Sequence, residues 1–414
     1  MTTATIEQRH TTGADETAIT TEQTTCCIVG GGPAGAVLAL MLARKGIPVT
    51  LLEEHKDFDR DFRGDTVHPS VLEIMDELGL AEQLHELPHT KMRGIGAPFN
   101  ISFSVVKTRY PYIMMLPQAS FLEFIVGEAS RYPNFRLEMG ARAEELIIEA
   151  GEVCGVVYRG QGGHRRLLAA LTVGADGRFS RIRRLAGFEP VKSSTPIDVM
   201  WFRLPRNPGD TDQLQGRIKR GHILVMLNRF DHWQLGYVIP KGSYQKVRAA
   251  GLEALREAIV ATAPELADRV GLLQDWKQIS VLAVESNRLL RWYRPGLLLI
   301  GDAAHTMSPV AGVGINYAIQ DAVEAANLLG APLREGRLRT ADLAAVQRRR
   351  ELPVRVIQTF QTMVQDRILG PVVHDGGEVS MPPVIGVIQR LPLLRTLLVR
   401  MVGFGFWPSH VARN

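Results

Sequence analysis

The fold of this chain is decided by the stretch Cys26-Cys27-Ile28-Val29-Gly30-Gly31-Gly32-Pro33-Ala34-Gly35. A short apolar run of strand-favouring residues leads into a Gly-x-Gly-x-x-Gly turn, and helix-forming apolar residues follow at 36–43. A second apolar run at 48–52 then ends in the acidic pair Glu53-Glu54. Strand, glycine-rich turn, helix, strand and acid is the order that a dinucleotide-binding unit requires.

Each residue of the turn has a physical role in such a unit. Gly30 permits the tight turn, Gly32 lets the backbone approach a pyrophosphate, and Gly35 lets helix and strand pack closely. Pro33 and Ala34 open the helix, whose N-terminus offers N–H groups and partial positive charge to a diphosphate. We therefore expect these residues to bind a dinucleotide, the alternative being a glycine-rich turn with a structural role alone.

The acidic pair at the end of the second strand is expected to contact a ribose. Glu53 lies 23 residues after Gly30, and Glu54 follows it directly. A carboxylate at this distance accepts hydrogen bonds from ribose hydroxyls in the dinucleotide fold. This motif alone does not separate NAD from FAD.

Composition indicates a globular protein and argues against a nucleic-acid partner, a disulfide framework and a metal site. With 414 residues, 45% of them hydrophobic and 22% charged, the chain is an ordinary globular one of about two domains. Its net charge of +5 is too mild to indicate a nucleic-acid partner. The three cysteines, Cys26, Cys27 and Cys154, form neither a disulfide framework nor a metal-ligand pattern, so we expect no metal site and a cytoplasmic location.

The N-terminal region raises two questions of organisation. Residues 1–23 are polar and rich in threonine, which predicts a disordered tail. Residues 24–43 carry no charge and have the length of a membrane helix, but the Gly-Gly-Gly-Pro cluster at 30–33 would break one. A strand, turn and helix are therefore predicted there.

A second strand–loop–helix lies far along the chain. The apolar run Leu297-Leu298-Leu299-Ile300 leads into Gly301-Asp302, and a helix with apolar residues at helical spacing begins near Ile315. A carboxylate after a strand end suits a polyhydroxylated chain. A helix N-terminus suits a ring that gains negative charge on reduction.

These residues resemble the second FAD motif of class A flavoprotein monooxygenases, the family typified by para-hydroxybenzoate hydroxylase. Between the two motifs, Asp176-Gly177-Arg178-Phe179-Ser180-Arg181-Ile182-Arg183 is similar to the family's D-G-x-x-S-x-x-R segment. The resemblance implies that Asp302 binds the ribityl chain and that Asp176 and Arg178 serve FAD and nicotinamide binding. It also implies that Gly301 and Val313 belong to the cofactor site. The loop with Pro309, Gly312, Gly314 and Asn316 is expected to contact the flavin ring through its backbone and to stabilise the reduced ring, and no acid or base for the reaction is identified.

Weaker matches to the same family occur at other positions. Arg63, in Asp61-Phe62-Arg63-Gly64-Asp65-Thr66, resembles an arginine beside FAD, and Gln118 resembles a cofactor-contacting residue at a helix start. A surface salt bridge for Arg63 and a helix cap for Gln118 are the alternatives. For His305 we expect a structural hydrogen bond rather than proton transfer.

The implied fold is α/β, with a Rossmann-like FAD-binding domain and a second, antiparallel-sheet substrate domain. The FAD-binding domain is expected at 24–90, 118–187 and 286–330, and the substrate domain at 91–117 and 188–285. Strands are predicted at 198–204 and 222–239 with a turn at 228–231, and a helix at 252–262. Because the sequence does not reveal which face of these strands is inward, the residues that follow are candidates for the pocket or for plain core: Met200, Phe202, Met226, Trp233 and Tyr237.

The C-terminal part, 331–414, is predicted to be helical, with one helix beginning at Thr340 and Asp342. Residues 348–350, three arginines, are expected on a solvated face. The apolar stretch 384–407 carries Arg390, Arg395 and Arg400. We favour its packing at a domain or subunit interface over contact with a membrane surface, because residues spaced by five do not lie on one face of a helix. A monomer or a homodimer is expected.

The function implied by the resemblance is a monooxygenase. NADPH or NADH, as a transient co-substrate, would reduce FAD, and O₂ would form a flavin C4a-hydroperoxide that hydroxylates an aromatic or polycyclic small molecule. The chain has no second Gly-x-Gly-x-x-Gly unit for a nicotinamide cofactor, which agrees with the resemblance.

Other functions remain open at this point. The same fold could carry out epoxidation, halogenation or an isoprenoid-type reduction, although the Trp-x-Trp-x-Ile-Pro segment of halogenases is missing. A non-catalytic flavin-binding protein would leave the reactive loop without a purpose. A NAD-dependent dehydrogenase would leave the Gly301-Asp302 unit unexplained.

Overall fold

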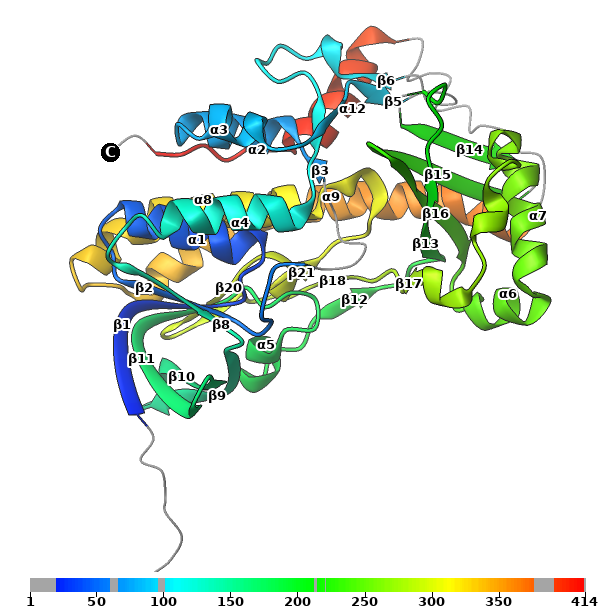
Figure 1. Ribbon diagram of the computed structural model, residues 1–414. Helices are drawn as coiled ribbons and strands as arrows, with labels where there is room; N and C mark the ends of the chain where they lie inside the picture. The colour runs from blue at the N-terminus through cyan, green and yellow to red at the C-terminus, as the bar shows by residue number, and fades with distance from the viewer. Residues whose placement is uncertain are drawn as a thin grey trace, which may run out of the picture.

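The computed structural model describes residues 20–59, 66–95, 101–211, 214–219, 221–375 and 391–412. Its main body is an eight-stranded sheet in the order β19-β20-β11-β1-β2-β8, from which β10 and β9 branch at β11 (Figure 1). The strands are β1 (Thr20–Val29), β2 (Val49–Glu53), β8 (Phe135–Met139), β9 (Arg142–Glu149), β10 (Glu152–Gly160), β11 (Gly163–Gly174), β19 (Tyr293–Arg294) and β20 (Leu297–Leu299). β20, β11, β1, β2 and β8 run parallel, as in a dinucleotide-binding fold.

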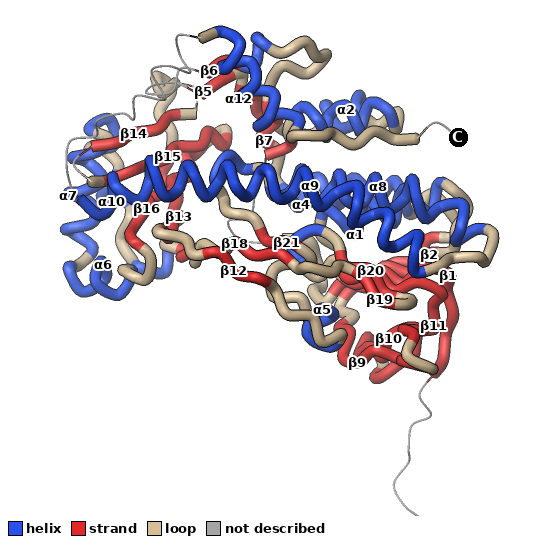
Figure 2. Tube along the Cα trace, turned by 180° about the vertical axis from the view of Figure 1, so that it is seen from behind, coloured by secondary structure: helices blue, strands red, loops and turns tan. Residues whose placement is uncertain are grey.

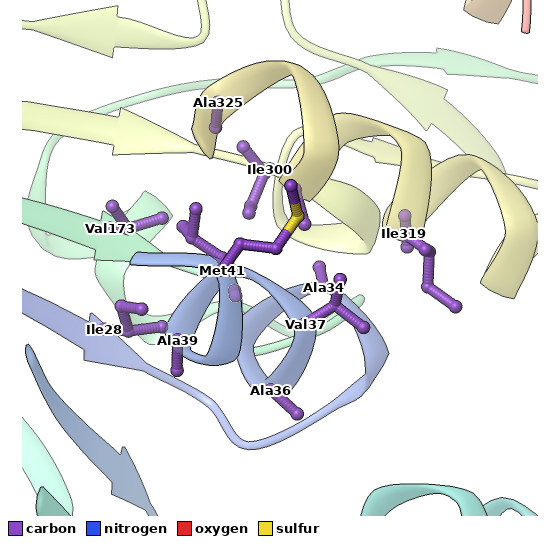
Figure 3. Packing of buried hydrophobic residues seen from close by; sticks show 14 of the residues in the cluster. Ile28, Ala34, Ala36, Val37, Ala39, Met41, Val173, Ile300, Ile319 and Ala325 are labelled. Carbon is purple, nitrogen blue, oxygen red and sulfur yellow. The ribbon is translucent and has the colours of Figure 1, made fainter. Parts of the chain in front are cut away.

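The first helix lies at the centre of this body. α1 (Pro33–Arg44) follows β1 directly, and every residue from 34 to 43 is buried. It packs between the sheet and α8 (Gly314–Arg334), with Met41 beside Ile300 (Figure 3). A helix that is apolar on all sides is a buried one, which explains why this stretch resembles a membrane segment in hydropathy. No helix in the described part of the chain is long and apolar enough to cross a membrane.

A second, antiparallel sheet has five strands in the order β14-β15-β16-β13-β17. They are β13 (Ile197–Pro205), β14 (Gln215–Lys219), β15 (His222–Arg229), β16 (His232–Pro240) and β17 (Ser280–Leu282). Two helices, α6 (Tyr244–Ala250) and α7 (Leu252–Thr262), lie beside this sheet (Figure 1). In the register of β13 and β16, Trp201 is opposite Gly236, and a side chain at 236 would come within 2.9 Å of its ring.

Three small sheets and several short helices complete the body. The sheets are β12-β18-β21, β3-β7-β4 and β5-β6. Their strands are β3 (Thr66–Val67), β4 (Thr90–Met92), β5 (Gly94–Ile95), β6 (Ile101–Ser102), β7 (Ile113–Met115), β12 (Val191–Ser193), β18 (Ser286–Arg288) and β21 (His305–Thr306). The helices are α2 (Pro69–Glu77), α3 (Ala81–Glu86), α4 (Gln118–Ala129) and α5 (Arg181–Leu185).

The C-terminal region is helical and joins the two large sheets. α9 (Thr340–Val364) packs on α8 and crosses the molecule toward the antiparallel sheet, where α10 (Gly370–Asp375) meets β15 and β16 (Figure 2). A π-helical turn, Gln365–Leu369, connects the two. α12 (Pro392–Phe404) then packs against α2 and β6.

The predicted α/β fold, with a second antiparallel sheet and a helical C-terminal region, is confirmed. α7 covers the predicted helix 252–262, and α9 begins at Thr340, where Asp342 Oδ2 accepts from the N–H of Arg339 at 2.9 Å. The predicted tail was too long, because residues 20–23 extend β1 and pair with β11. The segment 91–117, predicted for the substrate domain, contributes to small sheets. Its strand β7 pairs with β3, which comes from the segment predicted for the FAD-binding domain, and its strands β5 and β6 pair with each other.

Candidate functional site

One cavity of about 1290 Å³ extends from the carboxyl ends of β1, β2 and β11 to the antiparallel sheet. Residues 30–34 and 176–179 line its polar end. Side chains of β13, β15, β16 and α9 line its other end, which is mostly apolar. Ligands of open α/β sheets bind outside the carboxyl ends of the strands, so the polar end lies where a dinucleotide is expected.

The glycines of the first turn form the polar end. Gly30 has φ +106°, and a Cβ there would lie 2.4 Å from the carbonyl oxygen of Ala175. A Cβ at Gly35 would lie 1.9 Å from the carbonyl oxygen of Gly30. At Gly32 a Cβ would meet nothing within 4 Å. Gly30 and Gly35 are therefore required by the chain itself, whereas Gly32 keeps space open in the cavity.

Gly32 is also the N-cap of α1, and no side chain caps this helix. Pro33 and Ala34, the first helical residues, line the cavity. The leading peptide N–H groups and the positive end of the helix dipole are thus available to an anion at this point.

The acidic pair at the end of β2 divides into two roles. Glu53 Oε2 accepts from the N–H of Gly31 at 2.8 Å, and Oε1 accepts from His55 N at 2.9 Å and Nδ1 at 2.7 Å. Glu54 pairs with Arg142 at 3.0 Å on the surface. Both acids line the cavity, but only the carboxylate of Glu53 is fixed against the glycine turn.

Asp176 acts on its own segment. Its carboxylate accepts from Ser180 Oγ at 2.5 Å and from the N–H groups of Arg181 at 2.7 Å and Ile182 at 3.0 Å, at the start of α5. Burial raises the pKa of Asp176, while these hydrogen bonds oppose the shift. Asp176 therefore holds the turn that presents Arg178 to the cavity.

Arg183 joins this segment to the second motif, a contact that the sequence did not reveal. Its Nη2 donates to the carbonyl of Arg178 at 2.6 Å, and its Nη1 donates to those of Asp302 at 3.3 Å and Ala303 at 3.1 Å. The one feature of the sequence that could have indicated this contact is the arginine that ends the D-G-x-x-S-x-x-R segment. Two segments far apart in the chain are fixed together beside the cavity.

The loop after β21 forms the middle of the cavity wall. Pro309, Gly312 and Gly314 line it, together with Asp302. Gly312 has φ +63°, and Thr66 Oγ1 donates to its carbonyl at 2.9 Å. Ala311 has φ +66°, which is rare for a residue other than glycine, so the loop stores local strain where it faces the cavity.

Several predicted flavin contacts support this loop from behind. Asn316 is buried: its Oδ1 accepts from the N–H of His68 at 2.8 Å, and its Nδ2 donates to the carbonyls of Thr66 and Gly312, both at 3.3 Å. Val313 and Gly301 are buried beside it, in the core. The side chain of Asn316 therefore fixes the shape of the loop.

Two glutamines of α9 hold this loop and the strand before it, and the sequence predicts neither role. Gln361 Nε2 donates to the carbonyls of Ser308 and Val310, each at 2.9 Å. Gln358 Nε2 donates to the carbonyl of Thr306 at 3.1 Å and to that of Asn287 at 2.9 Å. The sequence signal for them is weak, because the buried face of α9 also carries Gln347 and Arg350.

His305 has the structural role predicted for it. Its Nε2 lies 2.6 Å from Asp321 Oδ2, and Arg350 Nε donates to Asp321 Oδ1 at 2.8 Å. Asp321 also accepts from the N–H of Gly301 at 3.0 Å. Burial acts to raise the pKa of Asp321. His305 and Arg350 together have a larger effect in the opposite direction, so the pKa lies below its ordinary value and the carboxylate stays ionised. The prediction of a solvated face was wrong for Arg350, which is 1% exposed.

The five predicted pocket residues lie on the other face of the antiparallel sheet. They are buried against Leu255 and Ile259 of α7, in a core that comprises Met200, Phe202, Met226, Trp233 and Tyr237. Their strand neighbours Val199, Trp201 and Val225 line the cavity. Successive strand residues point to opposite faces, so these five residues are core, which is the alternative that the sequence left open beside a role in the pocket.

The two weaker matches have different outcomes. Gln118 is the first residue of α4 and lines the cavity. Arg63 lies outside the described residues.

The lining fits FAD. The uncapped helix and open Gly32 provide a diphosphate cradle, and Glu53 provides a fixed carboxylate beside it. Asp302 comes next along the wall, followed by a loop of small residues that a flat ring can approach. The cavity then continues into an apolar chamber large enough for a second molecule.

Comparison with known proteins agrees with this geometry. A family model described as the FAD binding domain matches residues 23–359. The chain is 34% identical over 386 residues to 6-methylpretetramide 4-monooxygenase of Streptomyces rimosus, covering 91% of each protein.

Solved structures share the fold at lower identity. The anhydrotetracycline hydroxylase OxyS of Streptomyces rimosus is 23% identical, with a TM-score of 0.75, over 92% of this chain and 76% of that one. The flavin-dependent brominase Bmp2 is 19% identical, with a TM-score of 0.72, over 92% and 93%. By the family match and the 34% relative, the chain belongs to the FAD-binding class A flavoprotein monooxygenase family.

Proposed function

We propose that this chain hydroxylates a polycyclic aromatic molecule, using FAD, O₂ and NADPH or NADH. One observation carries the proposal: a single cavity leads from the diphosphate cradle, along the loop at 309–314, into an apolar chamber under the antiparallel sheet. A flavin held by the loop would therefore face a substrate held in the chamber. The relative at 34% identity is named for a polycyclic substrate, which supports a substrate of similar size.

Bound FAD supplies the hydride acceptance and O₂ activation that the side chains of the chain lack. The loop at 309–314 offers peptide groups, and α8 begins at Gly314 without a side-chain cap or an acidic residue in its first turn. Its N-terminus therefore favours negative charge on a ring placed against the loop. The glutamines of α9 and the side chain of Asn316 hold these peptide groups in place.

The chamber keeps water from the reacting atoms and holds the substrate ring. Val199, Trp201 and Val238 of the sheet line it, together with Phe360 of α9 and Ile368 of the π-helical turn. Apolar walls favour a large aromatic molecule, and the cavity volume leaves room for several fused rings. We further propose that the enzyme acts in the cytoplasm as a monomer or homodimer; the buried thiols of Cys26 and Cys27 suit a reducing compartment.

The experiment is oxygen labelling of the product. Holoenzyme is incubated with NADPH or NADH, ¹⁸O₂ and a series of phenols from 1-naphthol to anhydrotetracycline. A product heavier by one ¹⁸O atom, formed with faster NAD(P)H oxidation, is the expected result. A brominated product in the presence of bromide, or product oxygen that comes from water, would contradict hydroxylation.

A further inference from the structure

α12 directs one positive side chain into the apolar chamber. Arg395, Leu398 and Val402, spaced by three and four residues, line the cavity from one face of this helix. On the opposite face Leu393 is 81% exposed and Leu397 is 62% exposed. The inward position of Arg395 is thus fixed by the same helical phase as its apolar neighbours.

Packing holds α12 in this orientation. Val399 and Phe404 are buried in a core with Phe103 and Ile113, and Leu227 of the antiparallel sheet packs against the same core. His68 Nδ1 donates to the carbonyl of Val402 at 2.8 Å. The helix therefore joins the sheet that covers the chamber, and Arg395 lies on a rigid element.

The guanidinium of Arg395 has no partner within the described part of the chain. Its Nε is buried and makes no hydrogen bond. Two buried arginines differ: Arg350 is paired with Asp321, and Arg183 donates to three carbonyls. Arg395 is partly buried, and its side chain lines the cavity, so an anionic ligand there would gain a charge-assisted hydrogen bond from its guanidinium.

The described acidic residues of the cavity wall lie toward the cofactor end. Glu53, Glu54, Asp176 and Asp302 belong to the cradle and loop. Glu285 lies near Arg183, at the cofactor end. Burial lowers the pKa of Arg183, and the charge of Glu285 partly opposes this effect. At the chamber, Arg229 and Arg367 also line the wall, and the Nε of the buried Arg229 donates to Gln234 Oε1 at 2.9 Å. The chamber is therefore apolar with positive charge at its wall.

We propose that Arg395 binds an oxyanion on the ring system of the substrate: a phenolate, an enolate or a carboxylate. This rests on the proposed function, since it places the substrate in the chamber. A nearby guanidinium favours the ionised form of a bound phenol or enol. Ionisation enriches the ring in electrons, which is what an electrophilic oxygen requires, so Arg395 selects substrates that carry an acidic group and orients them by it.

The experiment measures binding without turnover, by isothermal titration calorimetry on oxidised FAD-loaded protein. The probes are 2-naphthoate for the carboxylate, 2-naphthol for the phenol and 2-naphthamide as the neutral analogue. In Arg395→Met, the Kd of 2-naphthoate should rise about ten-fold or more, because a charge-assisted hydrogen bond is lost. The Kd of 2-naphthamide should stay within about two-fold, and Arg395→Lys should retain most of the binding of 2-naphthoate.

The matched control is Arg400→Met, which removes an exposed arginine from the same helix and should change neither Kd. FAD content and the thermal unfolding midpoint show that each variant is folded. A response of 2-naphthol alone would assign the subsite to phenolate, and a response of 2-naphthoate alone to carboxylate; both support the proposal. Equal losses for the acidic and neutral probes, or wild-type protein that does not prefer the acids, would overturn it.

This outcome is separate from that of the proposed function. Protein that binds the acids through Arg395 but incorporates no ¹⁸O would keep the subsite and lose the monooxygenase reaction. Protein that hydroxylates a neutral polycycle and ignores the acids would keep the reaction and lose the subsite.

Discussion

At the scale of single residues, the three glycines of the first turn differ in what they do. Gly30 and Gly35 lack side chains because their own backbone surroundings exclude one, whereas the space beside Gly32 is open. The sequence predicts all three positions equally well, since the motif gives only their spacing. The division between folding and binding appears only when neighbouring backbone atoms are in place.

Gly32→Val therefore separates cofactor binding from folding. Position 32 has φ −69° and ψ −178°, which a β-branched residue accepts, so the variant should fold, with the unfolding midpoint of wild-type protein from which FAD has been removed. Its side chain would occupy the cradle, and the purified protein should contain little or no FAD. Absorbance of released flavin measures this. Gly127→Ala, at an exposed helical position with open space, is the control and should retain FAD; normal FAD content in Gly32→Val would contradict the assignment.

Asp321→Asn tests the buried network behind the loop. The substitution leaves Arg350 buried without its counter-charge, which should cost about 3–5 kcal/mol of unfolding free energy. FAD should also be released more readily, because Asp321 accepts from the N–H of Gly301 beside the cavity. Urea unfolding measures the first effect. Glu335→Gln opens the exposed pair with Arg337 and should not move the midpoint; equal midpoints for both variants would contradict this role for Asp321.

At the scale of elements, the sequence predicted the strands and missed their faces. The approximate limits of β13, β15, β16 and α7 follow from strand-favouring aromatic and branched residues, helix-forming residues and the turn at 228–231. Both faces of this sheet are apolar, one against α7 and the other toward the chamber, so alternation could not show which face binds. The role of α9 was also hidden, because its glutamines act on carbonyls that are distant in sequence.

Gln361→Leu tests whether α9 positions the loop. The buried carbonyl of Ser308 and the partly buried carbonyl of Val310 would lose their donor, and the buried one left unsatisfied costs about 1–3 kcal/mol. We expect reduced stability and more H₂O₂ for each NAD(P)H consumed, because the loop would no longer hold the ring against the chamber.

The control is Gln365→Leu on the same helical segment. Gln365 is equally buried, but its Nε2 has no hydrogen-bond partner in the described residues, so its loss should change neither quantity. Peroxide yield and thermal unfolding of the two variants give the answer. Equal behaviour of the two variants would show that the hydrogen bonds of Gln361 do not position the loop.

At the scale of the whole molecule, one buried histidine connects three parts of the chain. His68 is the N-cap of α2. Its backbone N–H donates to Asn316 Oδ1 of α8, and its ring Nδ1 donates to the carbonyl of Val402 on α12. Because a carbonyl can only accept, Nδ1 carries a proton, and burial opposes a second proton on the ring. Nothing in the sequence predicts this connection, since its partners are more than two hundred residues away.

The connection makes stability depend on pH. Burial lowers the pKa of His68 from 6.5 to about 4. Between these values the unfolded chain binds a proton that the folded chain excludes, so stability is complete above pH 6.5 and falls as the pH drops toward 4. The shift corresponds to about 3 kcal/mol at most. In His68→Gln, unfolding midpoints measured from pH 7 to 5 should fall less steeply than in wild type; parallel curves would contradict this origin.

The cavity has to bind FAD and also let NAD(P)H reduce it if the protein is the monooxygenase proposed above. The most direct test is a visible spectrum of the purified or FAD-reconstituted protein, followed by anaerobic addition of NADPH or NADH. We predict flavin absorption bands that bleach with one of the two nucleotides, bleach faster when a polycyclic phenol is present, and return when air is admitted. A colourless protein that takes up no added FAD, or a bound flavin that neither nucleotide reduces, would contradict the account.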